Sequence, residues 1–96
     1  MFRWLNKQGV ESSTGFVLQS VDRYGYHYRE GGKTMRIDVE PLRVPGGDYY
    51  EEIIEKSFCV WLPPHAAEAV TPEEQERLKA NVGDALTFMG IKHRFH

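Results

Sequence analysis

The chain has little cysteine and no long apolar run. Cys59 is the only cysteine among 96 residues, so no intramolecular disulfide can form, and the reducing cytoplasm is the expected location. Its neighbours Phe58, Val60 and Trp61 predict a buried thiol rather than a reactive one. The longest apolar run, residues 58–62, falls far short of the ~20 residues that cross a bilayer. The first residues also lack the apolar segment of a signal peptide. We therefore expect no membrane partner.

An excess of charge of one sign is also lacking. The chain carries 12 basic and 14 acidic residues, a formal net charge of −2. This balance argues against strong non-specific binding to nucleic acid, which requires a basic excess or stripe. The apolar share of 41% and the charged share of 27% are ordinary for a folded protein. The length predicts a single domain over residues 1–96.

Catalytic, cofactor and metal-binding motifs are missing. No two of the four histidines are spaced four apart on a predicted helix, and none pairs with the cysteine at zinc-ligand spacing. No serine stands in a G-x-S-x-G motif, and no glycine pair matches a phosphate-binding loop. We therefore expect no enzymatic activity, no cofactor and no metal.

A β-hairpin is the best-defined element that is present. Residues 23–30 and 33–40 each alternate in polarity, and they flank Gly31 and Gly32, which suit a tight turn with positive φ. A two-residue turn fixes the register and places three tyrosines opposite three aliphatic side chains. The predicted pairs are Tyr24–Val39, Tyr26–Ile37 and Tyr28–Met35. This face is either part of the core or an exposed stacking platform for single-stranded nucleic acid.

The rest of the sheet is less clearly marked. Glycine and a serine-rich cluster predict a loop over the first dozen residues, and residues 16–21 predict a strand. Pro41 and the Pro-Gly segment at 45–48 predict breaks after the hairpin. Residues 49–56 fit either a strand or a helical turn, and residues 58–62 predict a short buried strand.

One amphipathic helix is predicted over residues 72–89. Thr71 is placed as its N-cap, Pro72 at its first position and Glu74 in a capping box. Gly90 ends it, and residues 91–95 predict a short terminal strand. The apolar stripe consists of Leu78, Val82, Ala85, Leu86 and Met89. The sequence thus predicts an α+β fold, an antiparallel β-meander packed against one C-terminal helix, with the stripe covering the tyrosine face.

Two segments supply candidate partner-binding residues. Glu51, Glu52 and Glu55 form an acidic cluster, predicted to be a solvated face that recognises a basic partner. Trp61 is either a buried strand end or an exposed interface anchor, and His65 follows it after two prolines.

Residues in both halves of the chain resemble a known class of protein. The segments are Tyr28-Arg29-Glu30-Gly31-Gly32-Lys33, Asp38-Val39-Glu40-Pro41, Thr71-Pro72 and Ala85-Leu86-Thr87-Phe88-Met89-Gly90-Ile91. In this order they resemble small bacterial immunity-type proteins of polymorphic toxin systems. The resemblance implies an α+β protein without a cofactor that binds its cognate toxin by surface complementarity.

The leading hypothesis is therefore a non-enzymatic protein-binding module, an immunity-type inhibitor of a bacterial toxin. The alternatives are a single-stranded nucleic-acid-binding sheet and an accessory subunit. A homodimer is a further expectation, formed by pairing of the terminal strand at 91–95 across a two-fold axis.

Overall fold

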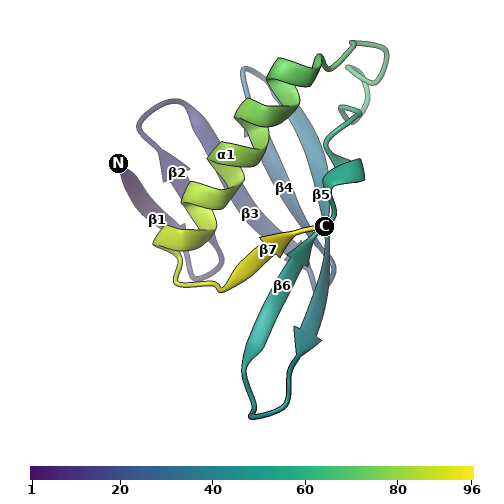
Figure 1. Ribbon diagram of the computed structural model, residues 1–96. Helices are drawn as coiled ribbons and strands as arrows, with labels where there is room; N and C mark the ends of the chain where they lie inside the picture. Colours follow the sequence, from purple (N-terminus) through teal and green to yellow (C-terminus); the bar gives the residue numbers. More distant parts are fainter.

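A curled seven-stranded sheet carries one helix across its inner face (Figure 1). The computed structural model describes residues 1–96. The strands follow one another in chain order, antiparallel from β1 to β6, and β7 pairs parallel to β6. The elements are β1 (Phe2–Asn6), β2 (Gly9–Ser12), β3 (Phe16–Asp22), β4 (Gly25–Glu30), β5 (Lys33–Arg43), β6 (Tyr49–Ile53), the 3₁₀ turn η1 (Glu55–Ser57), α1 (Pro72–Phe88) and β7 (His93–Phe95). The expected α+β meander with a short terminal strand is confirmed.

The central hairpin has the register predicted from its two-residue turn. Tyr28 pairs with Met35 and Tyr26 with Ile37, and all four side chains are buried. Tyr24 keeps its predicted pairing, since Val39 N–H donates to its oxygen at 2.9 Å. Its side chain is nevertheless 54% exposed and not part of the core, because it lies in the turn before β4 begins at Gly25.

The first dozen residues form a hairpin, so the predicted loop is wrong. β1 pairs with β2, and β2 pairs with β3, with Val10 fully buried opposite Leu18. Gly9, one of the loop signals, is a close-approach position, because a Cβ there would lie 2.0 Å from the Gln19 side-chain oxygen.

Pro41 does not break β5. It lies opposite Glu51 of β6, whose N–H donates to the Lys92 oxygen at 3.0 Å, on the side away from β5. The pair is therefore a non-hydrogen-bonded one, and the missing N–H of Pro41 costs no bond to β6. The ambiguous segment from residue 49 is a strand as far as Ile53 and then a 3₁₀ turn.

No strand forms over residues 58–62. Phe58 and Trp61 are buried, whereas Cys59 and Val60 are exposed, so the prediction of a buried thiol is also wrong. Buried residues three apart suit a turn, since strand residues on one face are two apart. This irregular segment is tied to the sheet where Leu62 N–H donates to the Thr34 oxygen at 2.7 Å.

The helix covers the tyrosine face, as predicted. Thr71 caps it by accepting a hydrogen bond from Glu74 N–H at 3.1 Å, and Gly90 ends it with a φ of 76°. Leu78, Val82, Ala85 and Leu86 are fully buried in one core cluster with Tyr26 and Tyr28. This helix is neither long nor apolar enough to span a membrane.

Candidate protein-binding surface

The three glutamates of the acidic cluster do not share a surface. Glu51 and Glu52 are only 9% and 8% exposed, and as successive strand residues they point to opposite faces of the sheet. Glu52 forms an ion pair with Arg94 at 2.9 Å, and Glu55 is exposed beside Lys79 at 3.2 Å. The interpretation of a solvated acidic face is therefore wrong for Glu51 and Glu52, because β6 is an inner strand between β5 and β7.

The Glu51 carboxylate lies inside the curl of the sheet. One of its oxygens accepts a hydrogen bond from the Tyr26 hydroxyl, and the other accepts one from the Tyr49 hydroxyl at 3.1 Å. Burial and the adjacent Glu51 charge raise the pKa of both tyrosines, so both phenols remain donors at neutral pH.

Trp61 and His65 both have contact partners within the chain. Trp61 is 1% exposed, with Lys33 Nζ 4.7 Å from its ring centroid, so it is a buried side chain and not an exposed anchor. His65 Nδ1 lies 2.5 Å from Glu68 Oε2, and this contact holds the pKa of Glu68 below its usual range. The structure does not bring these two residues together with Glu51, Glu52 or Glu55.

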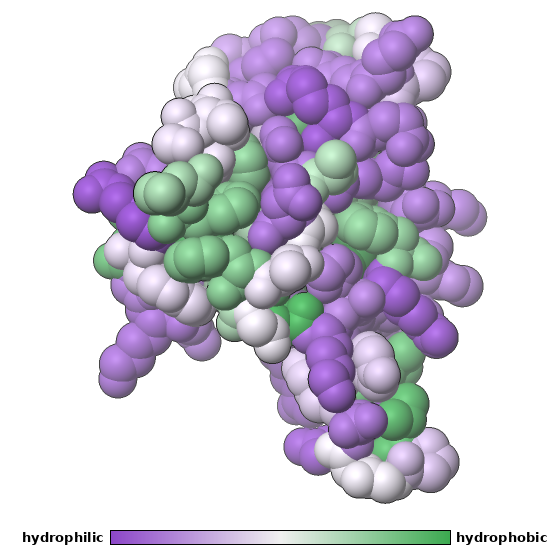
Figure 2. Space-filling view, turned by 60° about the vertical axis from the view of Figure 1, so that its left-hand side comes forward, coloured by the Kyte–Doolittle hydropathy of each residue, from purple (hydrophilic) through white to green (hydrophobic).

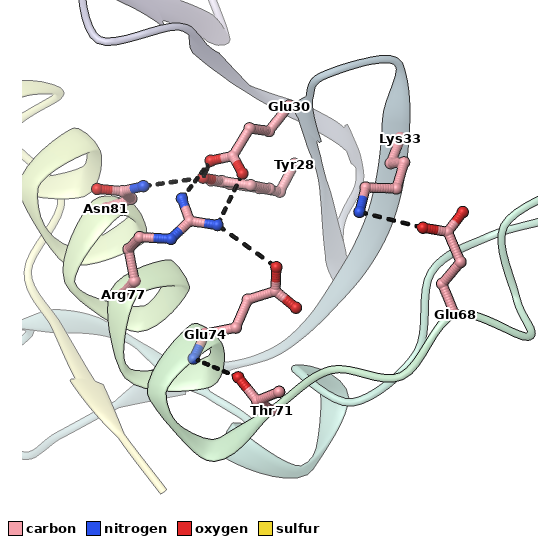
Figure 3. A network of polar contacts seen from close by, with 8 residues as sticks. All are labelled: Tyr28, Glu30, Lys33, Glu68, Thr71, Glu74, Arg77 and Asn81. Atoms are coloured by element: carbon pink, nitrogen blue, oxygen red, sulfur yellow. Dashed lines mark hydrogen bonds and ion pairs between the residues drawn. The ribbon is translucent and has the colours of Figure 1, made fainter.

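A polar network fixes the N-terminal half of α1 to the central hairpin (Figure 3). The Arg77 guanidinium donates to both oxygens of Glu30, at 2.6 and 2.8 Å. The Tyr28 hydroxyl donates to Glu30 at 2.7 Å and accepts from Asn81 at 2.9 Å. Arg77 keeps the pKa of Glu30 below its usual range, while burial raises the pKa of Tyr28. These groups satisfy one another, so the network serves to position the helix.

The C-terminal half of α1 has a different neighbour, an aromatic cluster formed by Phe2, Trp4 and Phe88. The Phe2 and Phe88 rings stack with centroids 5.3 Å apart, and the Trp4 and Phe88 centroids are 5.8 Å apart. Trp4 remains 48% exposed and Phe88 43% exposed. Figure 2 turns this side of the molecule forward and shows hydrophobic residues gathered in several areas among polar ones. Large contiguous patches of exposed apolar side chains are candidate interaction surfaces.

Phe2 and Trp4 of β1 also have backbone groups that are unpaired. Ser13 N–H donates to the Met1 oxygen at 2.8 Å, and the next pair along the ladder is Phe2 with Ser12. Bonded and non-bonded pairs alternate in an antiparallel ladder, so Phe2 and Trp4 make no bonds to β2. Their N–H and C=O groups point to the open edge of the sheet. An incoming strand would meet unpaired backbone groups and the aromatic cluster together.

The sequence prediction missed this surface because it treated the segment as a loop. The usable signal was the alternation of Phe2, Arg3 and Trp4, which places both aromatics on the face of the buried Val10. Arg3 points to the other face and pairs with Glu11 at 2.6 Å.

Comparisons with known proteins add no family to this description. No protein-family model matches the chain, and neither the curated proteins nor the solved structures give a match.

Proposed function

We propose that the chain is a non-enzymatic protein-binding module that takes up an extended segment of another protein as an additional strand beside β1. One observation carries this proposal. Phe2 and Trp4 present free backbone groups at the sheet edge, and the half-exposed side chains of Trp4 and Phe88 lie beside it. In strand addition, backbone hydrogen bonds supply affinity and alternate side chains supply specificity.

The charge near the edge favours a foreign strand over a second copy of the chain. In a symmetric antiparallel dimer, β1 would pair with β1 of the second copy through the edge groups of Phe2 and Trp4. The two-fold axis would then pass beside Arg3 or beside Trp4. The first register places Arg3 opposite its own copy, and the second places the two arginines on a diagonal, so their charges repel except as far as Glu11 compensates each Arg3. A foreign strand with an acidic residue opposite Arg3 avoids this repulsion. It would place apolar residues on the face of the aromatic cluster.

The homodimer predicted through the terminal strand has less to support it. β7 spans only His93–Phe95, and its edge lies at the other end of the sheet from β1. Short edge strands are among the features that proteins use to discourage edge pairing.

A toxin domain is the first class of partner to test. The hairpin and capped helix that carry the resemblance to immunity-type proteins are both present. The proposed contact differs from the one that the acidic cluster suggested, because Glu51 and Glu52 are buried. The nucleic-acid alternative loses its platform, since Tyr26 and Tyr28 lie beneath the helix.

Selection from a library of short random peptides, followed by NMR titration, tests the proposal. We expect enriched peptides that alternate apolar and acidic residues and shift the amide signals of Phe2 and Trp4. Trp4→Ala should weaken their binding at least tenfold, and Tyr24→Ala, which truncates a similarly exposed aromatic elsewhere, should leave it unchanged. Unchanged binding in Trp4→Ala, or a dimer of the free chain that Trp4→Ala dissociates, would overturn the proposal.

A further inference from the structure

A concave site lies where two turns and two strands meet at one end of the sheet. Gln8 from the β1–β2 turn, Arg23 from the β3–β4 turn, and Tyr49 and Glu51 from β6 line a cleft of about 360 Å³. Ser20 and Asp22 at the end of β3 complete the wall. The cleft does not include Phe2, Trp4 or Phe88, so it is independent of the surface proposed above.

Glu51 gives this cleft a carboxylate that is nine-tenths buried and has no cationic partner. The Tyr26 and Tyr49 hydroxyls donate to its two oxygens, but no lysine, arginine or histidine forms an ion pair with it. Glu52, its neighbour on β6, is paired with Arg94. A buried charge without a counter-charge is costly, and a cation that reaches it recovers part of that cost.

The other charged groups that line the cleft do not form an ion pair with Glu51. Arg36 donates to both oxygens of Asp22, at 2.9 and 3.2 Å, so the charge of Asp22 is already compensated. The charge of Arg23 acts on Tyr49, where it partly opposes the rise in pKa, but the guanidinium lies over the Tyr24 ring, 5.8 Å from its centroid, and makes no ion pair with Glu51.

We propose that the cleft binds a cationic nitrogen group, an ammonium or a guanidinium, with Glu51 as its counter-ion. The two phenols hold the carboxylate in place, and each carboxylate oxygen retains acceptor capacity for a donor from the ligand. The polar side chains of Gln8 and Ser20 flank the approach. The same chemistry is found in free small amines and guanidines and in a lysine or arginine side chain of a partner protein.

NMR titration with methylguanidinium chloride and methylammonium chloride, at constant ionic strength, tests this site. We expect saturable shifts of the Ser20, Tyr49 and Glu51 amide signals, absent when sodium chloride replaces the ligand. Glu51→Gln should weaken binding at least tenfold, and Glu55→Gln, which changes an exposed glutamate on the same segment, should leave it intact. Shifts that do not saturate, or that are equal in Glu51→Gln, would overturn the proposal.

Two further arms guard the interpretation. Tyr49→Phe removes the hydroxyl while retaining the ring, and it should weaken binding; it replaces Glu51→Gln as the test if that variant is poorly folded. Unchanged binding in a folded Tyr49→Phe would count against the site. A capped tripeptide with a central arginine distinguishes the source. Tighter binding than methylguanidinium indicates a partner's side chain, and weaker binding indicates a free small molecule.

Discussion

The two halves of α1 rest on the same sheet but differ in what surrounds them. Around the N-terminal half, Arg77 and Asn81 join Glu30 and Tyr28 in a network whose polar groups are satisfied within the chain (Figure 3). Around the C-terminal half, Phe88 packs against Phe2, which is partly buried, and against Trp4. The side chains of Trp4 and Phe88 remain nearly half exposed beside an open strand edge. Internal satisfaction is typical of structural support, and exposed aromatics beside unpaired backbone are typical of recognition. The comparison is the basis for our proposal that the first region provides stability and the second provides the binding surface.

The largest loss of stability should come from truncating a buried leucine, and it should be similar in both halves of α1. Leu78 in the N-terminal half and Leu86 in the C-terminal half are both fully buried. Truncation to alanine should lower the free energy of unfolding by about 2–5 kcal/mol in each case. Urea denaturation measures both values. A cost below ~1 kcal/mol for Leu86→Ala alone would show that the C-terminal half is not packed, and the comparison would fail.

The next largest loss of stability should come from a substitution in the polar network. Glu30→Gln leaves the Arg77 guanidinium without a charged partner and should cost about 1–3 kcal/mol. The pKa of Glu30 is lower in the folded chain than its ordinary value of 4.5, so its stabilisation is complete above that value. It is lost as the pH falls through the lowered pKa.

The pH dependence provides a second readout of the same substitution. The free energy of unfolding should fall on acidification in the unsubstituted chain and fall less steeply in Glu30→Gln. Glu40→Gln, which alters an exposed glutamate away from the network, is the control. Parallel pH profiles for all three chains would remove the structural role assigned to Glu30.

The helix cap should contribute less. Thr71→Ala removes the acceptor for Glu74 N–H and should lower the free energy of unfolding by ~1 kcal/mol. Thr71→Ser retains the hydroxyl and should restore most of the loss. Equal destabilisation by both substitutions, measured by urea denaturation, would mean that the hydroxyl bond is not the source.

The smallest effect on stability should come from the aromatic cluster. Trp4 is half exposed on an edge strand, so Trp4→Ala should cost less than ~1 kcal/mol, well below the cost of truncating a core residue. Thermal and urea denaturation measure it. A loss of several kcal/mol would identify Trp4 as a core residue and weaken its assignment to recognition.

The sequence was informative where local rules and burial agree. The hairpin register followed from two glycines and strict alternation, and the helix boundaries followed from Thr71, Pro72 and Gly90. The position of the helix over Tyr26 and Tyr28 followed because each element had only one apolar face to bury.

Prediction failed where residues that are distant in the sequence but close in space determine the local structure. Pro41 stays in β5 because its partner Glu51 bonds to the other side, a fact of sheet pairing that local composition does not contain. The burial of Glu51 likewise depends on β7 returning to the edge of β6. The proposed binding surface at β1 was not predicted, because Gly9 is a typical loop residue as long as its close approach to Gln19 is unknown.

The most direct test of the central claim is a side-by-side measurement of affinity for one selected peptide. The dissociation constant would be measured for the unsubstituted chain, Trp4→Ala and Glu30→Gln, all at a temperature where each chain is folded. The division between a recognition end and a structural end predicts at least a tenfold loss for Trp4→Ala and no change for Glu30→Gln. A loss for Glu30→Gln with full affinity in Trp4→Ala would contradict it.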